Sequence, residues 1–312
     1  MGIDRRRARE QLCHNSESMR TTIAVLLACA CLACPGWCEH STDIKKDLER
    51  IAAEAGGRVG VSAVLVESGE HIALHGDMAF FMASVVKFPV ALTVLHLVDT
   101  GKLRLDQKVR LLRSDPSPGV SVLGGKFKPG SDITVRQLLD YMITASDNTA
   151  CDVLLRISGG TPAVMARLQA LGIRGIRVDR SEKQNAAAYR RSARRFMTDP
   201  RDRSTPDAMA ALLAKFQQGE TLTPASTSLL RNLMEHTTTF TRMQTLLPPN
   251  TVVAHKTGTW DKAAINDVGI ITLPGGAKHV AVAIFTSGSR KKQAEVEHAI
   301  AEMTRAVYNY WQ

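Results

Sequence analysis

A serine and a lysine three residues apart, Ser84 and Lys87, could together form a nucleophile and its base. A serine hydroxyl is a weak nucleophile at neutral pH and needs a base that takes its proton. If Ser84 opens a helix, Lys87 lies on the same face one turn later. Apolar neighbours and nearby cations lower the pKa of a lysine, so its amine can act as this base. Alone, the pair is also typical of a helix cap followed by a surface lysine.

A second polar cluster, Ser146-Asp147-Asn148, stands at a predicted helix start. The hydroxyl of Ser146 could relay a proton between Lys87 and a leaving nitrogen. The amide of Asn148 could donate a hydrogen bond to a substrate carbonyl. These residue types also favour helix N-caps, and both roles can hold together.

A third cluster, Lys256-Thr257-Gly258, follows an apolar, strand-like segment. Lys256 and Thr257 would bind an anionic group, while the extended backbone could pair with an amide of the substrate. Gly258 removes a side chain where a ligand backbone must approach. The backbone N–H groups of Ser84 and Thr259 are candidate oxyanion donors. By itself, the segment is equally typical of an ordinary edge strand.

The three clusters together, in this order, are the signature of class A β-lactamases and penicillin-binding proteins. The chain resembles class A serine β-lactamases across nearly all of residues 42–312. Residues 177–182 resemble the start of the family's Ω loop, and residues 202–206 resemble its end. The resemblance implies an α/β (α+β) fold with a five-stranded antiparallel sheet flanked by helices and an inserted all-helical domain, as in the D,D-peptidases.

The same resemblance assigns roles to individual residues. Glu182 would hold and activate the water that hydrolyses an acyl-enzyme, a carboxylate that penicillin-binding proteins lack. Arg180 and Asp202 would form a salt bridge that pins the Ω loop. The catalytic set is Ser84, Lys87, Ser146 and Glu182; the substrate-binding set is Asn148, Lys256, Thr257, Gly258, Thr259 and Arg242; the loop-supporting set is Arg180, Asp202, Asn185 and Asp152.

Some positions depart from the usual family pattern. Asn185 follows Glu182 by three residues rather than four, and the segment from Arg180 to Asp202 is longer than in typical members. Asp152 stands where most members carry Asn, as in an extended-spectrum subgroup. Ile265 occupies the common position of the arginine that meets the substrate carboxylate.

The arginine can instead come from an alternative position. Arg242, which precedes Lys256 in the chain, matches the place that other members use. Its guanidinium could reach the same carboxylate.

The hydrophobic pattern predicts strands at both ends of the chain and helices between them. The predicted strands cover residues 59–66, 72–74, 251–255, 265–273 and 279–286. The predicted helices cover residues 43–55, 85–98, 134–142, 148–157, 161–171, 206–218, 224–234 and 295–310. We therefore expect an α/β sheet domain from 41–75 plus 236–312, and a helical domain, 76–235. The helical domain includes the Ω loop, 177–206, which lacks clear periodicity and is expected to be a functional or disordered loop.

Composition and the N-terminal segment narrow the cellular context. The 312-residue chain has a formal net charge of +10, but its basic residues are scattered and no nucleic-acid-binding module appears. The largest local basic cluster is Arg190, Arg191, Arg194 and Arg195, which is expected to be solvated. Residues 1–38 resemble a signal peptide, with Met19 as an alternative start, and predict export to a periplasm. Five of the six cysteines lie in or beside this segment.

The cysteine pattern leaves two expectations. Cys29, Cys31 or Cys34 could carry a lipid anchor after cleavage, although no apolar run is long enough for a membrane span. Cys151 alone lies in the body of the chain, which excludes an internal disulfide framework there, and it is expected to pack in the core.

Taken together, these features predict an exported, monomeric class A β-lactamase that confers antibiotic resistance and uses no metal or cofactor. Its substrates would be penicillins and cephalosporins, hydrolysed through an acyl-enzyme on Ser84. Either Lys87 or Glu182 could be the base of the acylation step. The rival interpretations are a D,D-peptidase that acts on cell-wall peptide and a penicillin sensor that stays acylated.

Overall fold

A five-stranded sheet is the central layer, in the order β2-β1-β9-β8-β7 with every neighbouring pair antiparallel. The computed structural model describes residues 35–261 and 263–312, so most of the predicted signal peptide, including Met19, lies outside the described residues. The strands are β1 (Arg58–Leu65), β2 (His71–Leu74), β7 (Val253–Trp260), β8 (Ala264–Thr272) and β9 (His279–Ser287). Strands from both ends of the chain thus share one antiparallel sheet, as the sequence predicts, and the first and last strands are neighbours in it.

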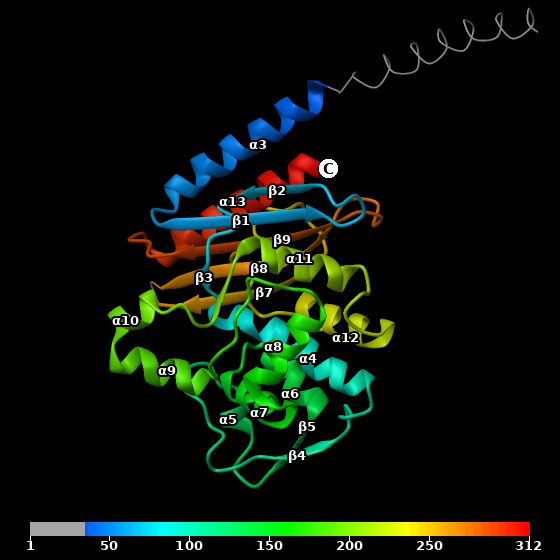
Figure 1. Ribbon diagram of the computed structural model, residues 1–312, viewed down its shortest axis with the longest axis vertical. Helices are drawn as coiled ribbons and strands as arrows, with labels where there is room; N and C mark the ends of the chain where they lie inside the picture. Colours follow the sequence, from blue (N-terminus) through cyan, green and yellow to red (C-terminus); the bar gives the residue numbers. More distant parts are fainter. Residues whose placement is uncertain (1–34, 262) are drawn as a thin grey trace, which may run out of the picture. The chain divides into compact units, whose positions relative to one another are not determined.

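Both faces of the sheet are buried. Successive strand residues point to opposite sides, and each side packs into its own apolar cluster. Along β9, Val280, Val282 and Ile284 join one apolar cluster, while Ala281, Ala283 and Phe285 join another. Helices α3 (Pro35–Glu54) and α13 (Gln293–Trp311) contribute to the first cluster. Helix α11 (Pro206–Gln217) packs on the opposite face, against β1 and β9 (Figure 1).

The helices between the two groups of strands share the core cluster of the α11 side. Leu92 of α4 and Leu154 of α7 belong to the same cluster as Phe285 of β9. Residues 44–312 form one compact unit, and the division into a sheet domain and a helical domain stays a prediction. These helices are α4 (Lys87–Asp99), α5 (Leu123–Lys126), α6 (Val135–Thr144), α7 (Asn148–Ser158), α8 (Gly160–Ala170), α9 (Glu182–Arg191), α10 (Ala193–Thr198) and α12 (Pro224–Glu235).

Short elements connect the larger ones near the predicted site. A 3₁₀ helix, η1 (Ala83–Val86), runs directly into α4. Strand β3 (Phe80–Phe81) pairs with β6 (Arg203–Ser204), and β4 (Lys108–Arg110) pairs with β5 (Asp132–Thr134). The β3–β6 pair ties the chain just before η1 to the end of the predicted Ω loop.

Residues 177–206 lack clear hydrophobic periodicity, yet the structure places two helices within them, α9 and α10. The sequence of α9, EKQNAAAYRR, has only two buried positions and no apolar stripe. The hydrophobic pattern of the sequence therefore does not indicate a helix here. The helix is held instead by a capping box between Ser181 and Gln184 and by its run of alanines.

Strand β7 also extends beyond the predicted residue 255 and ends at Trp260. The Lys256-Thr257-Gly258 segment, which was expected to be extended, is part of this strand. Its register is fixed by pairing with β8, where Lys256 lies opposite Val268 and Gly258 lies opposite Asn266. None of the helices that the structure describes is long and apolar enough to cross a membrane.

Candidate active site

Ser84 lies at a sharp change of backbone direction between β3 and α4. Ala83, directly before it, has φ +48°, a left-handed conformation that is uncommon for residues other than glycine. Such strained residues cluster at functional sites, where the surrounding structure holds them in place. Met82, directly before Ala83, donates its backbone N–H to the Asp202 carbonyl at 3.0 Å, which ties this part of the chain to the end of the predicted Ω loop.

Lys87 joins three parts of the predicted site through one buried ammonium group. Its Nζ donates hydrogen bonds to Ser84 Oγ at 2.7 Å, to Asn148 Oδ1 at 2.8 Å and to Glu182 Oε1 at 2.8 Å. Lys87 is fully buried and Glu182 is 6% exposed. An ammonium has three donors, so this arrangement uses all of them.

Ser146 lies against Lys256 on the other side of the site. Lys256 Nζ donates to Ser146 Oγ at 3.0 Å and to the carbonyl of Thr257 at 3.0 Å. Ser146 has φ +56°, a second left-handed residue at the site. Burial, and then the positive charge of Lys87, lowers the pKa of Lys256 to about 7. The hydroxyl of Ser146 thus accepts a hydrogen bond from Lys256, whereas the sequence analysis expected it to exchange a proton with Lys87.

Strand β7 passes very close to η1, and Gly258 makes this approach possible. A Cβ atom on Gly258 would lie 2.6 Å from the carbonyl oxygen of Met82 and 3.1 Å from the backbone nitrogen of Val85. The crowding partner is thus the chain's own backbone. Asn266 of β8 reinforces the contact, since its Nδ2 donates to the carbonyls of Phe81 and Met82 at 2.9 and 3.1 Å.

Helix α9 begins at Glu182, and Asp152 of α7 fixes that start. Asp152 accepts hydrogen bonds from the backbone N–H of Glu182 at 2.8 Å and of Lys183 at 3.1 Å. A carboxylate at a helix N-terminus also meets the positive end of the helix dipole. Ser117 donates to Asp152 at 2.7 Å, and burial raises the pKa of this carboxyl above its usual value.

Arg180 and Asp202 form a buried bidentate connection across the base of the α9–α10 segment. Arg180 Nε donates to Asp202 Oδ2 at 2.6 Å, and its backbone N–H donates to Oδ1 at 2.9 Å. A second carboxylate, Asp199, lies 3.2 Å from Arg180 Nη1. The guanidinium also lies over the ring of Phe196, 5.1 Å from its centroid.

Arg242 is buried behind β7 instead of projecting into the open pocket. It is 1% exposed, and its guanidinium donates to the carboxylate of Glu297 at 2.9 Å. Its Nη2 also donates to the hydroxyl of Thr259 at 2.6 Å, and its Nη1 donates to the carbonyl of Gly258 at 3.1 Å. Any contact between Arg242 and a ligand would therefore be made beside Thr259.

Two amide side chains complete the predicted set. Asn148 Nδ2 donates to the Pro118 carbonyl at 2.6 Å, which leaves its second N–H for a ligand. Asn185 is buried, and its Oδ1 has no hydrogen-bond partner among the described atoms. Cys151 is buried as a free thiol in the core, as predicted, and burial raises its pKa well above the usual value.

A pocket of about 340 Å³ opens over Ser84, between α9 and the end of β7. Besides predicted site residues, it is lined by Pro118, Gly119, Val120, Ala186, Tyr189, Arg190, Trp260 and Asp261. Tyr189 and Trp260 pack edge to face, with ring centroids 5.7 Å apart. The sequence analysis missed this aromatic wall, although Tyr189 follows Glu182 by seven residues and so shares its helix face.

The sequence analysis also missed a buried carboxylate that supports the site, Glu297 of α13, which pairs with Arg242. Glu297 belongs to no motif, so a single sequence carries no signal for this pair. Asp147, predicted as part of a helix start, caps α7 and also accepts the backbone N–H of Leu123 at 2.7 Å. Within the described residues, no group of three or more His, Cys, Asp or Glu side chains is placed to hold a metal ion.

Comparison with known proteins decides the family. The profile described as the "Beta-lactamase enzyme family" matches residues 43–311. The chain belongs to this family. It is 32% identical to β-lactamase VEB-1 of Pseudomonas aeruginosa, with 85% of the chain and 89% of the relative covered. It is 34% identical to the extended-spectrum β-lactamase PER-1 of the same species, with 86% and 87% covered.

Solved β-lactamase structures agree with this assignment. The chain matches the crystal structure of the TLA-3 extended-spectrum β-lactamase with a TM-score of 0.81 at 33% identity, covering 87% of the chain and 99% of that structure. A β-lactamase from Chitinophaga pinensis matches with a TM-score of 0.80 at 35% identity, covering 86% and 100%. The resemblance to class A β-lactamases and the predicted fold are thereby confirmed.

Gly258→Ala should impair this β-lactamase through its backbone, because the new methyl group meets the Met82 carbonyl and must push β7 away from η1. We expect kcat/KM for benzylpenicillin to fall by at least about tenfold, which corresponds to about 1.4 kcal/mol of lost transition-state stabilisation. Gly269→Ala is a matched control, since it crowds Ala254 and His255 farther along the sheet. If Gly258→Ala and Gly269→Ala lose the same activity and the same thermal stability, a specific role for the close approach of β7 to η1 is contradicted.

The fall of kcat/KM at alkaline pH should follow the loss of the proton from Lys256, because the pH dependence of kcat/KM reflects ionisation of the free enzyme. Below pH about 7 the ammonium is charged and attracts a substrate carboxylate; above it the amine is neutral. We therefore expect kcat/KM to fall as pH rises through about 7. Lys256→Arg keeps its charge and should not show this fall, as stopped-flow rates across pH 5.5–9 would test. The same fall in both proteins would contradict the assignment.

Proposed function

We propose that the chain hydrolyses the β-lactam amide of penicillins and cephalosporins through an acyl-enzyme on Ser84. The observation that carries the proposal is the Lys87 ammonium, which joins the hydroxyl of Ser84 to the carboxylate of Glu182 through bonds of 2.7 and 2.8 Å. This arrangement connects a nucleophile, a proton carrier and a second base. Chemistry in two stages, acylation and then deacylation, requires these three groups.

Acylation begins when Ser84 Oγ attacks the lactam carbonyl carbon and loses its proton. Lys87 Nζ is in direct hydrogen-bond contact with that oxygen, so we propose it as the immediate proton acceptor. To accept the proton, Lys87 must first be neutral, and Glu182 can take the lysine proton along their shared hydrogen bond. The lactam C–N bond then breaks, the nitrogen takes a proton from Ser146 Oγ, and the Lys256 ammonium, which contacts Ser146 at 3.0 Å, returns a proton to that hydroxyl. Exchange with solvent then reprotonates Lys256 and removes the proton from Glu182, so that Glu182 is a carboxylate again before deacylation.

Substrate orientation follows from the charges on each side of Ser84. Lys256 and Thr257 lie where they would bind the ring carboxylate, with Thr259 and Arg242 behind it. The free N–H of Asn148 would donate to the carbonyl of the acyl side chain. The backbone N–H groups of Ser84 and Thr259 would stabilise the developing oxyanion, which is commonly the largest single contribution to such catalysis.

Deacylation requires a base that activates water beside the ester. Glu182 is the buried carboxylate at the site, and Asp152 holds its backbone at the first turn of α9. The buried Oδ1 of Asn185, on the same helix, has no protein partner, and buried polar atoms of this kind are commonly satisfied by water. We therefore propose that Asn185 helps to hold the hydrolytic water despite its unusual spacing from Glu182.

The position of Glu182 separates this proposal from the two rival functions. A D,D-peptidase or a penicillin sensor needs only Ser84, Lys87 and the β7 segment to form an acyl-enzyme. A carboxylate in contact with Lys87, held in place by Asp152, favours turnover over a stable adduct. Membership of the β-lactamase family supports the same choice, and with it a role in resistance to these antibiotics.

The cellular context is part of the proposal. The signal-peptide pattern of residues 1–38 supports export to a periplasm, where the cell-wall-directed β-lactams act, with a lipid anchor on one of the N-terminal cysteines as an alternative to release. The two-domain division, the absence of a cofactor and the monomeric state belong to the same proposal.

Glu182→Gln should trap the acyl-enzyme, because the amide cannot act as the base of deacylation, while Lys87 without its anionic partner more readily reaches the neutral form that accepts the proton of Ser84. Loss of a general base typically costs ~10² to 10⁴ in rate. Intact-protein mass spectrometry after mixing with benzylpenicillin should show one persistent adduct on this variant and free enzyme for the wild type. Ser84→Ala is the control and should show no adduct. Rapid turnover without an adduct by Glu182→Gln would contradict the role of Glu182.

Arg242→Ala should lower both stability and activity, because Glu297 would remain buried without its cation. Breaking such a pair typically costs about 3–5 kcal/mol in the free energy of unfolding, measurable by urea denaturation. Loss of a charge-assisted bond near the substrate carboxylate should also reduce kcat/KM by roughly tenfold.

The double variant Arg242→Ala/Glu297→Gln separates these two effects. Removing the unpaired carboxylate should restore part of the stability but leave kcat/KM low. Recovery of kcat/KM together with stability would show that Arg242 serves the fold alone.

A further inference from the structure

One face of α9 lines the pocket over its whole length, from the catalytic centre to the rim. Glu182, Ala186 and Arg190 follow one another at intervals of four residues, which places them on one face of a helix. With a rise of 1.5 Å per residue, Arg190 lies about 12 Å along the helix axis from Glu182. The helix therefore carries a base at one end of the pocket and a cation at the other.

Arg190 is placed to meet a ligand rather than another part of the protein. It is exposed, and none of the carboxylates that the structure describes forms a salt bridge with it. The other carboxylate at this end of the pocket, Asp261, accepts the hydroxyl of Tyr189 at 3.2 Å. Arg190 also lies in the last turn of α9, where a cation is favoured by the helix dipole.

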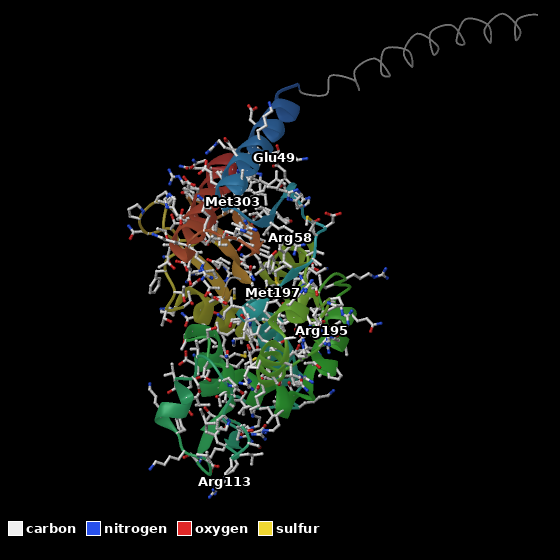
Figure 2. The ribbon with its side chains drawn as sticks, turned by 90° about the vertical axis from the view of Figure 1, so that its left-hand side faces the viewer. Glu49, Arg58, Arg113, Arg195, Met197 and Met303 are labelled. Carbon is white, nitrogen blue, oxygen red and sulfur yellow. The ribbon has the colours of Figure 1, made fainter. Side chains whose placement is uncertain are left out.

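Neighbouring arginines make this rim strongly basic. Arg191, Arg194 and Arg195 are all exposed on α9 and α10, and Figure 2 shows the side chain of Arg195 at the outside of the ribbon. Of these four arginines, Arg190 is the one that lines the pocket of Ser84. The others supply a general positive field, whereas Arg190 can make a direct contact.

We propose that Arg190 binds an anionic group at the far end of the acyl side chain of the β-lactam. This inference rests on the proposed function and adds a preference within it. When Ser84 attacks the lactam carbonyl, the ring carboxylate points toward Lys256 and Thr257. The acyl side chain leaves past Asn148 in the other direction, toward Ala186 and the rim. The preferred substrates are thus β-lactams whose acyl side chain ends in a carboxylate or sulfonate.

The contact should be modest in strength and sensitive to salt. Ion pairs of exposed side chains typically contribute 0.2–1 kcal/mol, which corresponds to a change in rate of up to about fivefold. Screening of exposed charges grows with ionic strength, so the effect should shrink as salt is added.

A matched pair of substrates can isolate this contact. Two 3-vinyl cephalosporins share the same ring system and aminothiazole group, and they differ in whether the oxime carries a carboxymethyl group or a hydrogen. We would measure kcat/KM for both, and take their ratio for the wild type, Arg190→Gln, Arg190→Lys and Arg194→Gln. Arg194→Gln removes the same charge from the neighbouring helix without touching the pocket.

The proposal expects Arg190→Gln to lower the ratio, carboxymethyl over hydrogen, by about two- to fivefold at low salt. Arg190→Lys should keep most of the ratio, and Arg194→Gln should change it less than Arg190→Gln does. Added salt of about 0.5 M should bring Arg190→Gln and the wild type together. An unchanged ratio in Arg190→Gln, or an equal fall in Arg194→Gln, would overturn a direct contact.

Benzylpenicillin, which has no charged group on its side chain, separates this test from that of the proposed function. Failure of the wild type to hydrolyse benzylpenicillin would reject the proposed function, and this inference with it. Normal benzylpenicillin turnover with an unchanged cephalosporin ratio in Arg190→Gln would reject only the role of Arg190.

Discussion

The buried ion pair between Lys87 and Glu182 is the constraint on which the site depends. A charge removed from water is costly unless it is paired and hydrogen-bonded. Lys87 meets this condition with three bonds, and one of its acceptors is the hydroxyl of Ser84. The same bonds that offset the cost of burying the lysine also hold the proposed nucleophile, Ser84, and the proposed base of deacylation, Glu182, on one ammonium group. Stability of the fold and arrangement of the chemistry are therefore linked.

The surrounding elements hold the Lys87–Glu182 pair in position. Glu182 comes from a helix with little apolar surface, so its place depends on polar support from Asp152 and from the Arg180–Asp202 pair. Ala83 and Ser146 hold left-handed conformations beside Lys87 and Lys256. Conformations of this kind persist only where neighbouring contacts determine them. The close passage of β7 over η1 provides such contacts.

The sequence allowed the five strands of the main sheet, most of the longer helices and the groups around Ser84 to be predicted, because hydrophobic period and local motifs are encoded within short segments. It did not allow α9 to be predicted, since a helix held by a capping box and by polar contacts from α7 has no apolar stripe. Arg242 shows a second limit. Its position could be predicted, but its burial against Glu297 depends on two segments that meet only in the folded chain. The Tyr189–Trp260 wall was missed for the same reason.

The two lysines of the site differ in their charged partners, and this difference would favour the binding of an anionic substrate. Lys87 has a carboxylate partner, Glu182, whereas the described partners of Lys256 are a hydroxyl and a carbonyl. Burial and the charge of Lys87 therefore act on Lys256 without a directly bonded anion to offset them, and its pKa falls to about 7. A ring carboxylate placed beside Lys256 would supply the missing negative charge and favour the protonated form. Substrate binding and protonation of Lys256 should consequently reinforce each other, so the substrate itself completes the electrostatic balance of the site.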